Sequence, residues 1–165
     1  MKGGSFKALD LGAAPGSWSL YILRNNKKIS LVSVDLVPLS HSFNQDLFES
    51  NEFTFIQGDF TLPEIREEIL SKGPYRLLLS DAAPATTGNR SLDTLRSLDL
   101  AETALDYAGT ALFKGGNFVV KVFQGGDTGT LLKTMRGLFE NAKSFKPKAC
   151  RSGSFETYYI GLGKK

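Results

Sequence analysis

The ten residues LDLGAAPGSW, at positions 9–18, decide the fold class of this chain. They combine a short apolar run, a turn that contains Gly12 and Gly16, and the start of a segment with helical spacing. A strand that passes through such a turn into a helix is typical of an open α/β sheet, in which ligands bind at the carboxyl ends of the strands. The positive end of the helix after the turn faces the same crevice. The stretch therefore predicts an α/β fold and places a ligand site beside the turn.

The rest of the chain repeats this alternation of strand and helix, which predicts a doubly wound, Rossmann-like sheet of mostly parallel strands. Two segments near the end, 142–147 and 154–162, follow each other without a helix and predict a closing antiparallel hairpin. We therefore expect a seven-stranded sheet in a single domain that spans residues 1–165. The other expected strands lie at 7–11, 30–36, 53–57, 75–80 and 117–123, and the expected helices at 17–24, 62–72, 92–112 and 128–142.

Composition excludes several classes of protein. With 41% hydrophobic and 22% charged residues, the chain can bury a core, so intrinsic disorder is not expected. No apolar stretch approaches the roughly 18 residues of a membrane span, and no signal-peptide pattern opens the sequence. A single cysteine, Cys150, excludes an internal disulfide and a multi-thiolate zinc site. We expect a cytoplasmic monomer with no bound metal and no membrane partner.

The turn also restricts the ligand. A dinucleotide fingerprint has three glycines, whereas this turn has two and carries Pro15, which lacks an N–H group. The chain has no Gly-Lys-Ser/Thr triplet for a nucleoside triphosphate. Asp35 follows Gly16 by 19 residues, the spacing at which a carboxylate accepts hydrogen bonds from ribose hydroxyls. The pattern favours a nucleoside ligand without phosphate, although a glycine turn can also serve helix packing alone.

A nucleoside that bears an amino-acid group matches these features, and we expect S-adenosylmethionine. Asp59 follows the third expected strand and is placed to accept from the adenine amino group. Asp81 follows the fourth strand and is placed to meet the methionine ammonium. Each carboxylate alone is also compatible with a helix cap or a solvated loop.

Lys121 is the unusual residue of the fifth expected strand, because it stands among branched and aromatic apolar residues. A lysine in a central strand loses hydration unless it has a partner. Asp81 and Glu156 are the natural partners, and stability alone is a weak reason to keep three such charges together. The alternative is that Lys121 lies near the strand end and extends its amine to water.

Four motifs resemble the FtsJ-like 2'-O-ribose methyltransferases of ribosomal RNA, and the likeness spans nearly the whole chain. The motifs are DLGAAPGSWS (10–19), SDAAP (80–84), VVKVFQG (119–125) and a C-terminal pattern from Lys146-Pro147 through Arg151 to ETY (156–158). The resemblance implies a class I methyltransferase fold and methyl transfer from S-adenosylmethionine to a ribose 2'-hydroxyl, most directly of a uridine in 23S ribosomal RNA.

The resemblance also assigns residues. It places Lys121, Asp81 and Glu156 in the catalytic set of the family. With the residue pattern, it predicts cofactor contacts at Gly12, Ala13, Pro15, Gly16, Ser17, Trp18, Asp35, Leu36, Asp59, Phe60 and Asp81.

The chain departs from the family pattern at its start. In the family, a first catalytic lysine lies on a helix ahead of the first strand, but only nine residues precede Asp10 here, and Lys2 and Lys7 do not match it. The N-terminal helix is therefore expected to be absent. This leaves a second hypothesis, a catalytically impaired RNA-binding or assembly factor that keeps the cofactor pocket. A nicotinamide-dependent oxidoreductase is a third hypothesis, which the glycine pattern disfavours.

Positive charge gathers near the end of the chain. Residues 143–165 hold six Lys or Arg against one Glu, whereas the remainder holds 14 basic and 16 acidic residues. A basic surface beside an active site is typical of RNA binding, although a run of charges is often only a solvated face. We expect ribosomal RNA, or the large ribosomal subunit, to be bound by Lys143, Lys146, Lys148 and Arg151.

Overall fold

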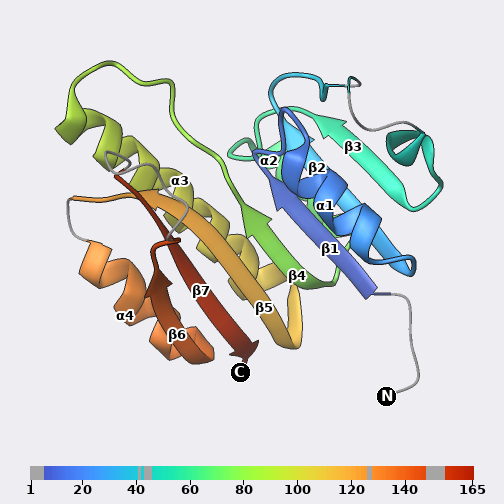
Figure 1. The fold of residues 1–165 in the computed structure, drawn as a ribbon. Helices are drawn as coiled ribbons and strands as arrows, with labels where there is room; N and C mark the ends of the chain where they lie inside the picture. The colour runs from blue at the N-terminus through green and yellow to red at the C-terminus, as the bar shows by residue number, and fades with distance from the viewer. Residues whose placement is uncertain (1–5, 41, 43–45, 126–127, 148–154) are drawn as a thin grey trace.

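The computed structural model describes residues 6–40, 42, 46–125, 128–147 and 155–165. Strands and helices alternate through most of this part of the chain (Figure 1). In chain order the elements are β1 (Phe6–Leu11), α1 (Ser17–Asn25), β2 (Ile29–Asp35), η1 (Leu47–Glu49), β3 (Phe53–Gln57), α2 (Pro63–Ser71), β4 (Tyr75–Ser80), α3 (Arg90–Ala111), β5 (Leu112–Phe123), α4 (Thr128–Leu138), β6 (Phe139–Phe145) and β7 (Glu156–Lys164).

The strands form one seven-stranded sheet in the order β3-β2-β1-β4-β5-β7-β6. The pairs from β3 to β5 are parallel, and β7 runs antiparallel to both of its neighbours, β5 and β6. The strand order reverses between β1 and β4, which is where open α/β sheets bind ligands. The predicted doubly wound sheet and its antiparallel closing pair are therefore confirmed.

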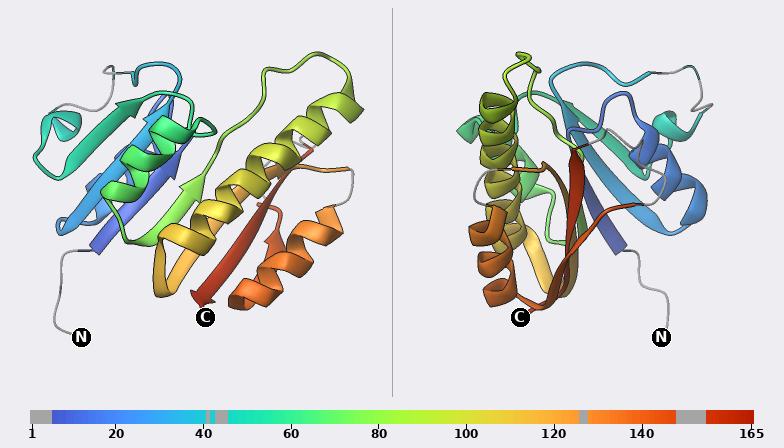
Figure 2. Two further views of the ribbon diagram at one scale, coloured as in Figure 1. Left: turned by 180° about the vertical axis from the view of Figure 1, so that it is seen from behind. Right: turned by 60° about the vertical axis from the view of Figure 1, so that its left-hand side comes forward.

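Helices cover the two faces of the sheet unequally (Figure 2). One face packs against α1, whose Ile22 and Leu23 join Ala8 and Leu31 in a small apolar cluster. The opposite face packs against α2, α3 and α4 and holds the larger core, which includes Leu78 and Phe118. Buried apolar side chains on both faces of the sheet thus fix the strands that carry the site, while the cavity lies at the carboxyl ends of these strands.

Three predicted boundaries differ from the structure by three residues or more. The helix expected over 128–142 ends at Leu138, and the strand expected from residue 142 begins at Phe139, as β6. The fifth strand begins at Leu112 instead of residue 117, because the segment around Gly115 and Gly116 extends it. Within the described ranges, no helix has the length and apolar character needed to cross a membrane.

Candidate active site

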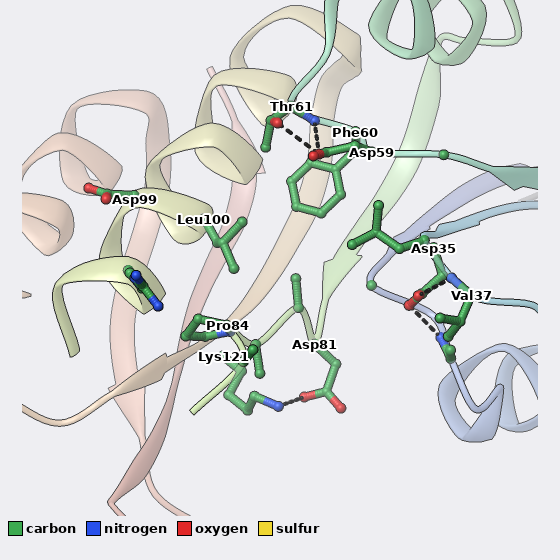
Figure 3. A pocket seen from close by; sticks show the side chains of 18 residues that line it. Asp35, Val37, Asp59, Phe60, Thr61, Asp81, Pro84, Asp99, Leu100 and Lys121 are labelled. Atoms are coloured by element: carbon green, nitrogen blue, oxygen red, sulfur yellow. Dashed lines mark hydrogen bonds and ion pairs between the residues drawn. The ribbon is translucent and has the colours of Figure 1, made fainter. Parts of the chain in front are cut away.

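A cavity of about 700 Å³ opens at the carboxyl ends of β1 to β5 (Figure 3). Residues that follow β2 and β3 form one wall, and α3 with the loop after β4 forms the other. The lining residues are Gly12, Ala14, Asp35, Leu36, Val37, Gly58, Asp59, Phe60, Thr61, Asp81, Ala82, Ala83, Pro84, Ala85, Arg96, Asp99, Leu100 and Lys121. The cavity has the size and mixed lining of a site for a small molecule.

In the turn after β1, the backbone N–H groups donate hydrogen bonds to residues of β2. The N–H groups of Gly12 and Ala13 donate to the Val34 carbonyl, at 2.9 and 3.1 Å. The Ala14 N–H donates to Oδ2 of Asp35 at 2.8 Å. Since the next residue is a proline, this part of the turn offers no free amide row to a phosphate.

Gly12 is required by close packing. Its φ of 73° lies in the left-handed region, and a Cβ at this position would lie 2.5 Å from Cα of Ala82. The loop after β4 can therefore approach the turn only because residue 12 has no side chain. This approach brings Asp81 to the same crevice as Asp35.

Asp35 and Asp59 border the wall formed by β2 and β3. Asp35 also accepts from the Val37 N–H at 3.0 Å, and Oδ1 of Asp59 accepts from the N–H and hydroxyl of Thr61 at 2.9 and 2.7 Å. These bonds hold both side chains in place. A carboxylate has about four acceptor sites, so each retains capacity toward a ligand.

The Lys121 side chain lies between two carboxylates from neighbouring segments. Its amine is 2.9 Å from Oδ1 of Asp81 and 3.8 Å from Oε1 of Glu156, and the lysine is 8% exposed. Burial raises the pKa of Asp81, and the charge of Lys121 opposes this effect. The lysine does not extend to water, so the structure brings together the three residues predicted to form a catalytic cluster.

Asp10 is a further ionisable group that the sequence reading did not single out. It lies at the end of β1, fully buried, and its Oδ2 accepts from the Ser19 hydroxyl at 2.6 Å. Its Oδ1 has no hydrogen-bond partner among the described residues. Burial raises the pKa of Asp10 to about 7, and the Ser19 bond lowers it in part. Asp10 is thus a buried carboxyl that lies outside the cavity lining.

The predicted cofactor contacts fall into two groups. Those that line the cavity are Gly12, Asp35, Leu36, Asp59, Phe60 and Asp81. The others lie outside the lining: Ala13 is buried, Pro15 and Ser17 are exposed, Gly16 faces the Phe48 ring, and the Trp18 ring lies 5.8 Å from that of Tyr158.

The predicted RNA-binding residues are described only in part. Lys143 lies on β6 and is exposed, and Lys146 follows that strand with its amine 3.3 Å from Oε1 of Gln124. Since Gln124 comes directly after β5, this hydrogen bond connects Lys146 to the end of the strand that carries Lys121. Lys148 and Arg151 lie outside the described residues.

Other lining residues were missed from the sequence. Val37, Gly58, Thr61 and the loop 82–85 adjoin residues that were predicted, so a wider margin around each strand end would have found them. Arg96, Asp99 and Leu100 come from the middle of α3, where no local motif marks them. Among the described residues, no cluster of His, Cys, Asp or Glu is arranged to hold a metal ion.

Comparisons with known proteins identify relatives that match most of the chain. The model of the family described as FtsJ-like methyltransferase matches residues 2–164. A Treponema denticola protein named ribosomal RNA large subunit methyltransferase E is 51% identical over 160 residues, which cover 96% of this chain and 78% of that protein. A relative of the same name from Borrelia garinii is 42% identical over 95% of this chain and 79% of its own.

Solved structures show the same fold. The crystal structure of a ribosomal RNA methyltransferase from Plasmodium falciparum matches with a TM-score of 0.77 and 26% identity, over 98% of this chain and 88% of that one. The match of the family model over nearly all residues, together with the close relatives, shows that this chain belongs to the FtsJ-like methyltransferase family.

Proposed function

We propose that the protein is an enzyme that transfers the methyl group of S-adenosylmethionine to a ribose 2'-hydroxyl of large-subunit ribosomal RNA, at a uridine of the 23S molecule. The observation that carries the proposal is the placement of Lys121 between Asp81 and Glu156 on the border of the cavity. The names of the relatives support the class of substrate. We further propose that the protein acts as a cytoplasmic monomer.

The residues of the cavity fit S-adenosylmethionine by the chemistry of their polar groups. The ribose hydroxyls, the adenine amino group and the methionine ammonium of this molecule all donate hydrogen bonds. Asp35, Asp59 and Asp81 supply acceptors at three successive strand ends. The exposed side chains of Leu36 and Val37 offer apolar surface beside Asp35. In this proposal Asp35 holds the ribose, Asp59 the adenine and Asp81 the ammonium.

The turn argues against the nicotinamide hypothesis. A dinucleotide needs free amides at the first turn to bind its pyrophosphate, and the amides of residues 12–14 donate to Val34 and Asp35 instead. Neither the described geometry nor the comparisons supply an observation in favour of the catalytically impaired RNA-binding factor.

The cofactor supplies an electrophilic methyl group when bound, so the protein's task is alignment and charge stabilisation. Lys121 has three N–H donors, and the two carboxylates engage it from separate segments. A remaining N–H is available to a ribose 2'-oxygen placed in the cavity. In this role the ammonium orients the oxygen and stabilises the negative charge that develops as its proton leaves. The carboxylates beside this amine, Asp81 at 2.9 Å and Glu156 at 3.8 Å, are placed to accept that proton.

The test is methyl incorporation by the purified chain. Tritiated S-adenosylmethionine is supplied with unmethylated large-subunit RNA, either naked or assembled into large subunits. We expect label in a dinucleotide that resists alkaline hydrolysis, because a 2'-O-methyl group blocks cleavage of the adjoining bond. Label in a base, or no label with either substrate, would contradict the proposal.

A further inference from the structure

The α3 wall of the cavity contributes a cation that the reaction described above does not use. Arg96 lines the cavity together with Asp99 and Leu100 of the same helix, and it faces a site otherwise rich in negative charge. The ionisable lining residues are four carboxylates, Asp35, Asp59, Asp81 and Asp99, and two cations, Lys121 and Arg96. Figure 3 shows Asp35 and Asp59 on the wall opposite α3.

The two cations differ in their partners. Lys121 lies within ion-pair distance of both Asp81 and Glu156. Arg96 is exposed and makes no ion pair with any residue in the described ranges. Of the two cations on the cavity lining, Arg96 is thus the one that has no ion-pair partner among the described residues.

The nearby acid Asp93 does not neutralise Arg96. The carboxylate of Asp93 is buried and accepts from the N–H and hydroxyl of Thr87, both at 2.8 Å. These bonds lower the pKa of Asp93, and the charge of Arg96 adds a smaller effect in the same direction. Asp93 therefore fixes the loop before α3, and the Arg96 guanidinium lies near this acid without a direct pair.

An RNA strand carries a negative phosphate on each side of every ribose. A strand that places one ribose beside Lys121 brings these phosphates toward a cavity with four carboxylates, which repel them. A guanidinium binds a phosphate through two parallel hydrogen bonds and offsets this repulsion. Its position on the exposed border of the cavity suits a macromolecular ligand that enters from solvent.

We infer that Arg96 binds a phosphate adjoining the ribose that accepts the methyl group, and so positions that ribose beside Lys121. This inference rests on the proposed function. The carboxylate of the cofactor's amino-acid group is also an oxyanion and can bind a guanidinium in the same way as a phosphate. The experiment must therefore distinguish the RNA phosphate from the cofactor carboxylate as the ligand of Arg96.

The experiment compares Arg96→Ala and Arg96→Lys with a matched control, Arg76→Ala. Arg76 is exposed on β4 and does not line the cavity. Affinity for an unmethylated large-subunit RNA transcript is measured by filter binding at several salt concentrations. Affinity for S-adenosylhomocysteine is measured by calorimetry, the KM for RNA by methyl incorporation, and folding by thermal melting.

We expect Arg96→Ala to weaken RNA binding about tenfold and to reduce the salt slope of log K by about 1, because one phosphate contact is lost. The KM for RNA should rise by a similar factor, while affinity for S-adenosylhomocysteine and the melting temperature match the control. Arg96→Lys should restore the salt slope but only part of the affinity, because a lysine binds phosphate as a point charge.

Three results would overturn the inference. They are an unchanged RNA affinity and salt slope, a loss confined to S-adenosylhomocysteine, and a parallel loss of both ligands together with a lower melting temperature. The last two would assign Arg96 to the cofactor carboxylate and to the fold, respectively. If the unsubstituted protein transfers no methyl group, the proposed function fails, and the RNA-binding and salt measurements still decide the role of Arg96.

Discussion

The amine of Lys121 lies 2.9 Å from a carboxylate oxygen of Asp81, although the two residues are 40 positions apart in the chain. The parallel pairing of β4 with β5 brings them together, because Ser80 is in register with Val120 and each partner is the next residue. The contact therefore follows from sheet register and does not depend on a mobile loop. An ion pair fixed in this way is preorganised for a substrate.

Replacing Lys121 by alanine should abolish catalysis and leave cofactor binding intact. We expect methyl transfer to fall by at least about 100-fold, since a preorganised donor to a developing negative charge contributes on that scale. Calorimetry with S-adenosylhomocysteine should give an affinity close to that of the unsubstituted protein. Lys114→Ala is the control, because Lys114 is an exposed lysine of the same strand. Loss of cofactor affinity in Lys121→Ala would show a structural lysine instead.

Replacing Asp35 by alanine should weaken cofactor binding more than it slows the chemical step. The substitution removes the proposed ribose acceptor and also leaves the Ala14 and Val37 amides without their partner. We expect the Kd for S-adenosylhomocysteine to rise at least about tenfold, since each lost hydrogen bond costs about 1 kcal/mol. Glu52→Ala, at an exposed position before β3, serves as control. An unchanged Kd in Asp35→Ala would remove this residue from the cofactor site.

Asp10 should make the protein less stable as the pH rises from about 4 to 7. Its pKa is 3.8 in the unfolded chain and about 7 in the folded protein, so within this range the folded state binds a proton that the unfolded state has released. By linkage, this contribution is fully present below the lower pKa and is lost as the pH passes the higher one. A shift of this size corresponds to about 4 kcal/mol.

The measurement is urea unfolding across this pH range, with Asp10→Asn compared with the unsubstituted protein. Since asparagine does not ionise, the variant should gain stability relative to the parent as the pH rises. Glu52→Gln should instead follow the parent at every pH. Parallel curves for Asp10→Asn and the parent would show that Asp10 is ionised in the folded protein.

The exposed lysine on β6 should contribute to RNA binding through charge alone. Lys143→Ala is expected to reduce the salt slope of log K for a large-subunit RNA transcript by about 0.7 to 1, whatever the sequence of the transcript. Lys133→Ala, an exposed position on α4, provides the comparison. If both variants show the slope of the parent protein, the RNA does not contact β6.

The sequence was most informative where a local pattern and the global fold agree. The run at 75–80 is apolar, of strand length and bounded by Pro74, and it forms β4 with the predicted limits. The helix predicted over 128–142 was too long because neither a proline nor a run of polar residues marks its end at Leu138. In addition, β6 is an edge strand, and its mostly exposed residues do not show the alternation of apolar and polar residues that predicts a strand. Its identity is set by pairing with β7, which is a tertiary effect.

The same distinction holds for the site. The sequence predicts that Asp35, Asp59, Asp81 and Lys121 share one site, because the carboxyl ends of parallel strands meet at the same edge of a sheet. All four line the cavity. Arg96 was not found, since a charged residue within a helix is typical of a solvated face, and only the packing of α3 along β5 places it on the cavity. The 1–165 domain limits, the roles assigned to Lys148 and Arg151 and the monomeric state remain predictions.

The position of β7 affects the order in which the site can form. This strand follows every other described element in the sequence, yet it lies between β5 and β6, and it carries Glu156. During synthesis, a nascent chain that has not yet released β7 leaves two strands with unpaired backbone groups, which are prone to aggregate. Without β7, Lys121 has Asp81 as an ion-pair partner but lacks Glu156. We expect methyl transfer to begin only after this segment has emerged from the translating ribosome and inserted into the gap.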